Sequence, residues 1–276
     1  MDYTDKVVLI TGGSSGIGLA LAKELAGGGA VVCLAARHED TLQAALAAIP
    51  DNKPGGKLAF PVDVRDAEAT IRLVEQVTKA AGVPDILINS AGVAHPGYVQ
   101  ALELEIYRWM MEVNYFGTVH MVKAVLPGML QRGSGYIVNI GSVAARIGVF
   151  GYTAYSGSKF AVAGFTDVLR MELKPLGIRV SLVLPNDTDT PQLAYENRYK
   201  PPELKYLLPA NSVIPAEVTA HNILQGMERN QYEICPDFGS RLFVRAAGML
   251  GGGLHPILDW LLKRTKTRIR LLNDKA

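Results

Sequence analysis

The stretch "KVVLITGGSSGIG", residues 6–18, decides the fold. Its first half, residues 6–11, is a continuous apolar and β-branched run, which predicts a strand buried on both faces. "TGGSSGIG" (11–18) follows at once, and a helical pattern over 16–26 begins inside it. Glycines after a strand let the backbone approach a pyrophosphate, and the N-terminus of the following helix offers it unpaired N–H groups. The stretch therefore predicts the first strand, turn and helix of a dinucleotide-binding unit.

Predicted strands and helices continue to alternate along the rest of the chain. Strand-like runs lie at 6–11, 31–36, 57–62, 85–89, 136–141, 179–184 and, after a longer insertion, 232–236. Helical patterns lie near 16–26, 39–49, 66–81, 102–131, 153–174 and 215–229. This alternation predicts an α/β fold, a Rossmann-type doubly wound parallel sheet of about seven strands with right-handed crossovers, in a single domain.

Composition narrows the class of protein. The chain has 276 residues, of which 49% are hydrophobic and 20% charged, a balance typical of a globular protein. Cys33 and Cys235 lie in apolar runs, which indicates core thiols in a reducing compartment and no disulfide. The five histidines show no ligand spacing, so no metal site is expected. No apolar stretch reaches about 18 residues, so no membrane-spanning helix is expected. The N-terminus is acidic at its start and has only a short apolar run, so no signal peptide is expected. We expect a cytoplasmic protein without a nucleic-acid partner.

The end of the second strand, "AARHED", bears on the choice of dinucleotide. A site specific for NAD usually has an acid there, bonded to the 2′-hydroxyl of the ribose. This chain has Ala36 followed by Arg37. A guanidinium suits a 2′-phosphate, so Arg37 with Ser14 and Ser15 favours NADPH/NADP+. The alternative is that Arg37 is solvated and one of the two following acids binds the ribose.

A second short stretch, "AYSGSKFA" (154–161), places Tyr155 and Lys159 four residues apart. In a helix both side chains share one face. An ammonium beside a phenol stabilises the phenolate and lowers the pKa of the tyrosine. By itself such a pair is more often a chance pairing on a solvated helix, so its meaning depends on the rest of the chain.

Seven motifs occur together in one order: "TGGSSGIG", "DV" at 63–64, "NSAG" at 89–92, "VN" at 113–114, "GS" at 141–142, "YSGSK" at 155–159 and "LPNDTDTP" at 184–191. With them the chain resembles the short-chain dehydrogenase/reductases over about residues 5–236. Two positions depart from the family pattern. Ser90 stands where a second Asn is usual, and Asn186 stands where a Gly is usual; neither departure removes a catalytic group.

The resemblance implies roles for particular residues. Ser142 would orient the carbonyl oxygen and Tyr155 would pass the proton. Lys159 would hold the nicotinamide ribose and keep Tyr155 acidic, and Asn114 would fix a water in a relay from Lys159 to solvent. The other residues implied to hold the cofactor are Gly12, Ser14, Ser15, Gly16, Ile17, Gly18, Arg37, Asp63, Val64, Asn89, Ala91, Gly92, Pro185, Thr188 and Thr190.

A narrower resemblance covers "FGYTAYSGSKFA" (150–161) and "PNDTDTPQLAYENRYKP" (185–201). Both are similar to the 3-ketodihydrosphingosine (3-ketosphinganine) reductases. This resemblance implies NADPH-dependent reduction of the 3-keto group of a long-chain amino ketone. Two alternatives stay open: reduction of another lipid-like carbonyl (a steroid, a retinoid or a 3-oxoacyl thioester), and a non-catalytic NADP-binding regulator. Four acids are candidates for attracting the substrate ammonium: Glu103, Glu105, Asp187 and Asp189.

We expect a domain over 1–240 that includes a substrate loop, residues 186–214, and a basic amphipathic tail over 241–276. The tail carries a net charge of +6, which leaves −4 on residues 1–240. Residues 256–272 predict a helix with an apolar stripe and a cationic face, typical of a peripheral anchor on the cytosolic face of a membrane. The alternative is a helix packed on its own sheet or on a second subunit, in a homodimer or homotetramer.

Overall fold

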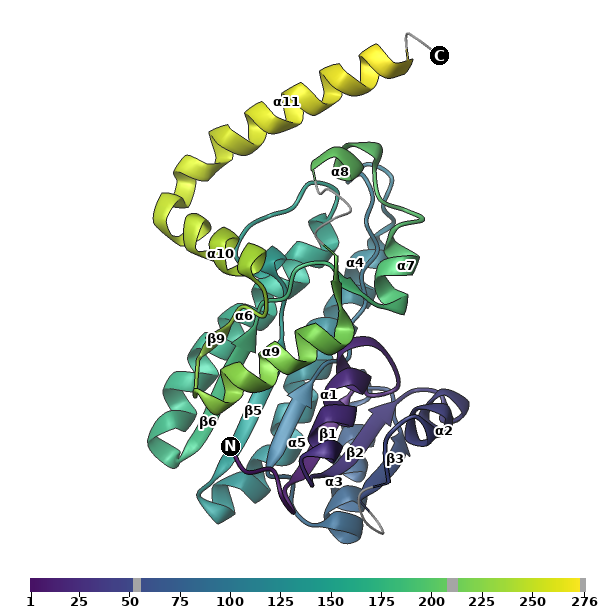
Figure 1. The fold of residues 1–276 in the computed structure, drawn as a ribbon, viewed down its shortest axis with the longest axis vertical. Coiled ribbons are helices and arrows are strands. Elements are labelled where there is room, and N and C mark those ends of the chain that lie inside the picture. Colours follow the sequence, from purple (N-terminus) through teal and green to yellow (C-terminus); the bar gives the residue numbers. More distant parts are fainter. Residues whose placement is uncertain (52–55, 208–212, 274–276) are drawn as a thin grey trace.

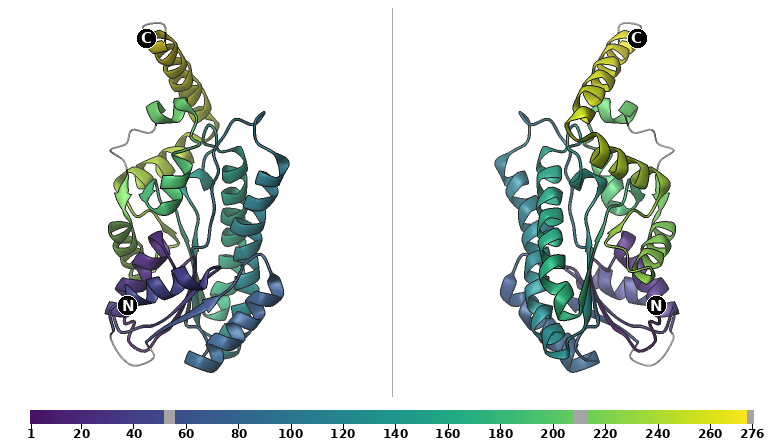
Figure 2. Two further views of the ribbon diagram at one scale, coloured as in Figure 1. Left: turned by 90° about the vertical axis from the view of Figure 1, so that its right-hand side faces the viewer. Right: turned by 90° about the vertical axis from the view of Figure 1, so that its left-hand side faces the viewer.

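The computed structural model describes residues 1–51, 56–207 and 213–273, and its centre is a parallel sheet covered by helices on both faces (Figures 1 and 2). The strands are β1 (Val7–Thr11), β2 (Val31–Ala36), β3 (Lys57–Pro61), β4 (Ile86–Asn89), β5 (Gly135–Ile140), β6 (Ile178–Val183) and β9 (Glu233–Ile234). Their order across the sheet is β3-β2-β1-β4-β5-β6-β9, and all pairings are parallel. The predicted doubly wound fold is confirmed, although the strand expected at 232–236 is only two residues long.

Helices on the two faces bury alternate residues of the strands. One face carries α1 (Gly16–Gly27), α2 (Glu39–Ala47) and α9 (Ala216–Glu228), and the other carries α3 (Ala67–Ala81), α5 (Gly117–Arg132) and α6 (Thr153–Leu173). Val8 and Ile10 of β1 belong to the first core, whereas Val7 and Leu9 belong to the second. Successive side chains of a strand point to opposite faces, so a sheet covered on both sides needs continuous apolar runs.

The long helical pattern over 102–131 is interrupted in the structure. It begins as α4 (Leu104–Met110) and passes through a π-helical turn, Met111–Phe116, into α5. Turns of this kind are rare and often lie at functional sites. This one carries Asn114, which is buried.

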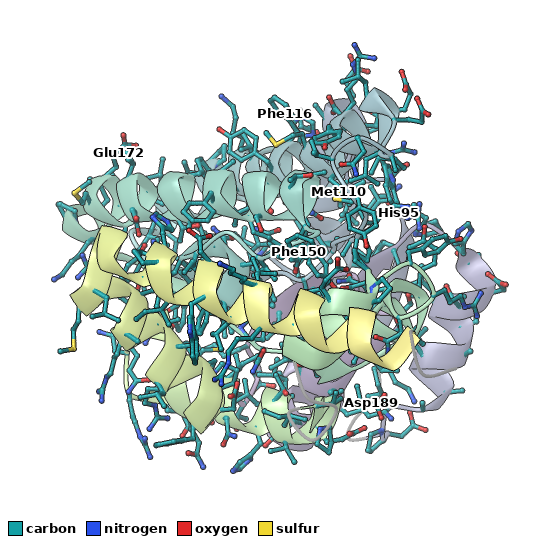
Figure 3. The ribbon with its side chains drawn as sticks, turned by 90° about the horizontal axis from the view of Figure 1, so that it is seen from above. His95, Met110, Phe116, Phe150, Glu172 and Asp189 are labelled. Atoms are coloured by element: carbon teal, nitrogen blue, oxygen red, sulfur yellow. The ribbon has the colours of Figure 1, made fainter. Side chains whose placement is uncertain are left out.

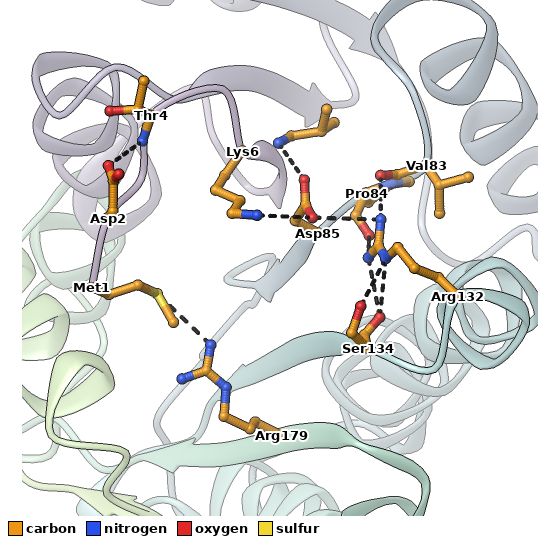
Figure 4. A network of polar contacts seen from close by, with 11 residues as sticks. Met1, Asp2, Thr4, Lys6, Val83, Pro84, Asp85, Arg132, Ser134 and Arg179 are labelled. Carbon is orange, nitrogen blue, oxygen red and sulfur yellow. Dashed lines mark hydrogen bonds and ion pairs between the residues drawn. The ribbon is translucent and has the colours of Figure 1, made fainter.

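The sheet has two rims, one formed by the amino ends of its strands (the amino edge) and one by their carboxyl ends (the carboxyl edge), and different groups lie at each. At the amino edge, Asp85 accepts a hydrogen bond from the N–H of Val7 (2.9 Å) and pairs with Lys6 (3.7 Å) and Arg132 (3.5 Å; Figure 4). At the carboxyl edge the chain leaves β1 toward β2 on one side, while β4 lies on the other side. Such a reversal of strand order opens a crevice in which α/β proteins bind ligands.

The segments that do not belong to the alternating strands and helices of the main sheet lie at its carboxyl edge. They comprise the two-stranded pairing of β7 (Thr188–Asp189) with β8 (Ile214–Pro215), and the helices α7 (Pro191–Glu196), α8 (Pro202–Leu207), α10 (Phe238–Leu250) and α11 (Leu254–Asn273). Residues 208–212 of the substrate loop and 274–276 of the tail lie outside the described residues. Helix α10 begins before the expected boundary at 240, because the Asp237 carboxylate caps it by accepting from the N–H of Ser240 (2.7 Å).

Helix α11 corresponds to the helix expected at 256–272. It contacts α8 and extends away from the body of the molecule (Figure 1). Figure 3 looks down on the same end and shows α11 crossing above it, with Phe150 and Asp189 on opposite sides of the helix. None of the helices in the described part of the chain is long and apolar enough to cross a membrane.

Candidate active site

A cavity of about 330 Å³ lies at the carboxyl edge, where β1 and β4 meet the loops after β5 and β6. It brings together eleven of the residues predicted from the sequence: Gly12, Ser15, Gly16, Ile17, Gly92, Ser142, Tyr155, Lys159, Pro185, Thr188 and Thr190. These residues come from positions 12 to 190, so the fold assembles a site whose parts are far apart in the chain.

The glycine-rich turn has the geometry of an anion site. Gly12 has a φ of +65°, a left-handed conformation that favours glycine. A Cβ on Gly18 would lie 2.4 Å from the carbonyl oxygen of Gly12, so the helix can approach the strand this closely only without a side chain. No side chain caps the N-terminus of α1 at Ser15, which leaves the first N–H groups of the helix for a ligand. These features fit the pyrophosphate of a dinucleotide.

Eight predicted residues do not line the cavity. Five of them (Gly18, Asn89, Ala91, Val64 and Asn114) are buried or half-buried behind its wall, and three (Ser14, Arg37 and Asp63) lie beyond its lining. Thr11 supports the wall by accepting from the N–H groups of Ser90 (3.2 Å) and Ala91 (3.1 Å). Hydrogen bonds from Arg65 hold the pKa of Asp63 below its usual range, and the charge of Arg37 also contributes.

The side chain of Asn114 fixes the loop that follows β4. Its Oδ1 accepts from the N–H of Val93 (2.8 Å), and its Nδ2 donates to the carbonyl of Val93 (2.9 Å) and to Oγ of Ser158 (2.9 Å). The amide is therefore engaged by protein groups, and it ties the π-helical turn to the loop and to α6. The water relay remains a prediction.

Ser142, Tyr155 and Lys159 face one another inside the cavity. Ser142 follows β5, and its side chain is hydrogen-bonded to Tyr155. Lys159 lies one turn further along α6, and its Nζ donates to the carbonyl of Ile140 (2.9 Å) and lies 5.7 Å from the centre of the Tyr155 ring. The tyrosine and the lysine thus share one helix face, as their spacing requires, and both point to the end of β5.

The pKa of Tyr155 is not lowered in this structure, although its spacing from Lys159 predicted a lower value. The pKa of Tyr155 is raised, because the phenol is buried and the negative charge of Glu196 lies near it, while the Ser142 hydrogen bond opposes the rise. Burial likewise lowers the pKa of Lys159 to about 8. The phenol consequently keeps its proton at neutral pH, which is the state needed to donate a proton to a ketone oxygen.

Several cavity residues had no role predicted from the sequence, among them Tyr152, Gln192, Glu196, Gly239 and Phe243. Glu196 is buried in the structure. The only sequence signal for it was its place in "ENR", within the stretch 185–201 that resembles the 3-ketosphinganine reductases. Gly239 and Phe243 belong to α10, so the start of the predicted tail is part of the site.

The four acids expected to attract an ammonium behave differently from one another. Glu103 and Glu105 are exposed at the start of α4 and do not line the cavity. Asp189 is exposed as well. Asp187 lines the cavity, and its carboxylate pairs with Lys200 (2.9 Å).

The doubly wound sheet, the glycine-rich turn and the arrangement of Ser142, Tyr155 and Lys159 define a dinucleotide-dependent carbonyl or alcohol enzyme. The family model for short chain dehydrogenases matches residues 6–200, so the chain belongs to the short-chain dehydrogenase family and is an oxidoreductase. The resemblance predicted from the motifs is confirmed.

Named relatives and a solved structure agree with this family. The chain is 39% identical to a 3-ketodihydrosphingosine reductase of Bos taurus over 222 residues, which cover 79% of this chain and 67% of that protein. It is also 39% identical to a 3-dehydrosphinganine reductase of Danio rerio over 269 residues, covering 94% and 81% of the two chains. A short-chain dehydrogenase structure from Streptomyces avermitilis superposes with a TM-score of 0.76 at 26% identity, over 95% of this chain and 98% of that one.

Proposed function

We propose that the protein reduces 3-ketosphinganine to sphinganine with NADPH. The observation that carries the proposal is the Ser142–Tyr155–Lys159 arrangement in a cavity that the substrate loop also lines. Val149, Leu193 and Phe243 give this cavity apolar wall, which suits the alkyl chain of a sphingoid ketone. The identities with reductases named for this substrate support the same choice.

The residues at the cavity have complementary tasks in the proposed reduction. When bound, the dinucleotide supplies a hydride to the carbonyl carbon. Ser142 holds the carbonyl oxygen beside Tyr155, and Tyr155 donates its proton to that oxygen as negative charge develops there. The N-terminus of α1 and Gly12 would hold the pyrophosphate, and Lys159 would hold the ribose and stabilise the phenolate that remains.

A substrate panel tests the proposal. Consumption of NADPH is measured with 3-ketosphinganine, a 3-oxoacyl thioester, a steroid ketone and a retinoid aldehyde, and products are identified by mass spectrometry. We expect 3-ketosphinganine to have the highest kcat/KM of the four. A higher kcat/KM for any other compound would replace the proposed substrate, and NADP binding without turnover of any of them would favour a regulator.

NADPH, rather than NADH, is proposed from the charge at the end of β2. Arg37 is exposed there and follows Ala36, and no acid occupies the position that usually binds a 2′-hydroxyl. Replacing Arg37 by Asp should raise the KM for NADPH about tenfold or more and shift the NADPH/NADH preference toward NADH, because an anion repels the 2′-phosphate.

Steady-state kinetics with both dinucleotides measure this shift. Arg72→Asp is the matched control, since Arg72 is an exposed arginine on α3 that pairs with Asp66 and Glu68 and does not line the cavity. An unchanged preference in Arg37→Asp would place the 2′-phosphate against other residues.

Helix α11 is proposed as a peripheral contact with an anionic, cytosolic membrane surface. Ile257 and Trp260 are 45% and 54% exposed on its outer side, and the guanidinium of Arg264 lies 4.4 Å from the Trp260 ring. Leu254 and Thr265 are buried on its inner side. An exposed tryptophan among cations is typical of helices at the membrane interface, and the tail carries a net +6.

Deletion of residues 256–276 should lower co-sedimentation with vesicles containing phosphatidylserine and reduce turnover of bilayer-borne 3-ketosphinganine. Turnover of a short-chain soluble analogue should change much less. Added salt should weaken vesicle binding, because interactions between exposed charges are screened beyond about 8 Å at physiological ionic strength and over shorter distances at higher salt. Equal losses on both substrates, with a lower melting temperature or oligomer mass and unchanged vesicle binding, would instead make the tail a subunit or domain contact.

A further inference from the structure

Glu196 places a buried carboxylate in the wall of the cavity, and the two side chains that donate hydrogen bonds to it are neutral. It is the last residue of α7 and is 6% exposed. Its Oε2 accepts from the hydroxyl of Tyr152 (2.7 Å) and its Oε1 from the amide of Gln192 (2.9 Å), and both donors are neutral. No Lys, Arg or His whose side chain the structure describes forms an ion pair with it. Burial accordingly raises the pKa of Glu196, since a buried charge with only neutral donors is costly.

The neighbouring acid differs in this respect. Asp187 also lines the cavity, but its carboxylate pairs with Lys200, so that lysine is already bound to another anion. Each oxygen of Glu196 accepts one hydrogen bond and has a second lone pair for a further donor. The cavity therefore presents one carboxylate that a cationic ligand could neutralise.

Glu196 lies near the reacting groups. Its negative charge raises the pKa of Tyr155 and opposes the fall in the pKa of Lys159, which places all three groups within electrostatic reach. Tyr152, which donates to Glu196, has its ring centre 5.6 Å from that of Tyr155. A cation bound to Glu196 would thus be close to the position of the carbonyl oxygen.

We infer that Glu196, oriented by Tyr152 and Gln192, binds the ammonium group of an α-amino ketone while Ser142 and Tyr155 hold its carbonyl oxygen. This assignment rests on the proposed function, since the ketone of 3-ketosphinganine has an amine on the adjacent carbon. Only three bonds separate that nitrogen from the oxygen, which keeps them within about 3.5 Å of each other. Glu196 then selects amine-bearing ketones over neutral ones.

Binding of the ammonium would also act on the proton donor. After burial, the charge of Glu196 is the largest of the causes that raise the pKa of Tyr155, and the charge of Asp187 adds to it. A cation paired with Glu196 offsets that charge, so Tyr155 becomes a stronger acid when an amino ketone occupies the cavity. Amine recognition and proton donation are coupled through one carboxylate.

The test compares Glu196→Gln with the wild type on two substrates, 3-ketosphinganine and the same β-hydroxy ketone without the amine. We expect kcat/KM for the amino ketone to fall about tenfold to a hundredfold, the usual loss for a hydrogen bond between charged groups. The ketone without the amine should lose no more than about twofold. The ratio of the two kcat/KM values, which should exceed about ten in the wild type, should approach one in the variant.

Glu203→Gln is the matched control. Glu203 is a second buried carboxylate that accepts from a tyrosine, Tyr98 (2.9 Å), but it does not line the cavity, so the substrate ratio should be unchanged. The melting temperature provides a second readout. A glutamine at 196 can accept the Tyr152 hydrogen bond without burying a charge, so the variant should melt at the same or a higher temperature. Equal losses on both substrates with a lower melting temperature would make Glu196 a structural clamp and overturn the inference.

A binding measurement separates this inference from the proposed function. Calorimetry with NADP+-saturated protein compares a short-chain 2-amino-1,3-diol with the 1,3-diol that lacks the amine. Selective binding of the amine that disappears in Glu196→Gln, together with no turnover of 3-ketosphinganine, would refute the function and leave the inference standing. Reduction of 3-ketosphinganine and of its desamino analogue with equal kcat/KM would support the function and refute the inference.

Discussion

Replacing Tyr155 by phenylalanine is expected to lower kcat about a thousandfold while NADPH affinity changes by less than about twofold. The substitution removes one oxygen, which is the proton donor and the partner of Ser142, and keeps the ring against Tyr152. General acid catalysis contributes about 10²- to 10⁴-fold, so the loss should be close to the full catalytic term. Stopped-flow or steady-state turnover gives the rate, and fluorescence titration gives the affinity for NADPH.

Tyr107→Phe is the matched control for this variant. Its hydroxyl pairs with Thr153 (2.9 Å) between α4 and α6, outside the cavity lining, so turnover should stay near the wild-type value. Wild-type turnover in Tyr155→Phe would remove the phenol from the mechanism, and a large loss of NADPH affinity would show that the hydroxyl mainly holds the cofactor.

Replacing Lys159 by methionine should impair both turnover and NADPH affinity, with a loss of turnover of about a hundredfold or more. Methionine has a similar length but no charge, so it can neither hold the ribose nor stabilise a phenolate at Tyr155. The carbonyl of Ile140 also loses its donor. A variant with unchanged affinity and a large loss in rate would restrict Lys159 to the proton step.

The stability of the Lys159→Met variant should depend on pH with a defined sign. Burial lowers the pKa of Lys159 to about 8 from the usual 10.5 of a lysine side chain, so the unfolded chain binds this proton more tightly than the folded one. The charge therefore opposes folding by about 3 kcal/mol below pH 8, at 1.36 kcal/mol for each pKa unit. That cost disappears as the pH rises from about 8 to 10.5, so the wild type should gain stability relative to the variant over this window.

Chemical unfolding of both proteins at several pH values measures the difference. Lys174→Met, at an exposed lysine just after α6, should show no comparable change with pH. A difference between wild type and Lys159→Met that stays constant from pH 7 to 10 would mean that Lys159 is not desolvated in the folded protein.

The sequence by itself determined the features that depend on neighbours along the chain. Alternating apolar runs and helical patterns predicted the sheet because a strand buried on two faces must be apolar at consecutive positions. The glycine at position 12 and the spacing of Tyr155 and Lys159 could be interpreted locally, since a turn needs a particular φ and a helix turn brings residues four apart to one face.

Only the tertiary structure decided the electrostatics of the site. Glu196 and Tyr152 are 44 residues apart, and their contact depends on how the substrate loop folds over α6. The pKa of Tyr155 rises because burial and the charge of Glu196 act on it, and neither can be seen in a four-residue spacing. Helix α10 contributes Phe243 to the cavity although its sequence resembled a surface tail. Burial and long-range charge are properties of the packed chain, so the tertiary fold determines which acid faces the substrate.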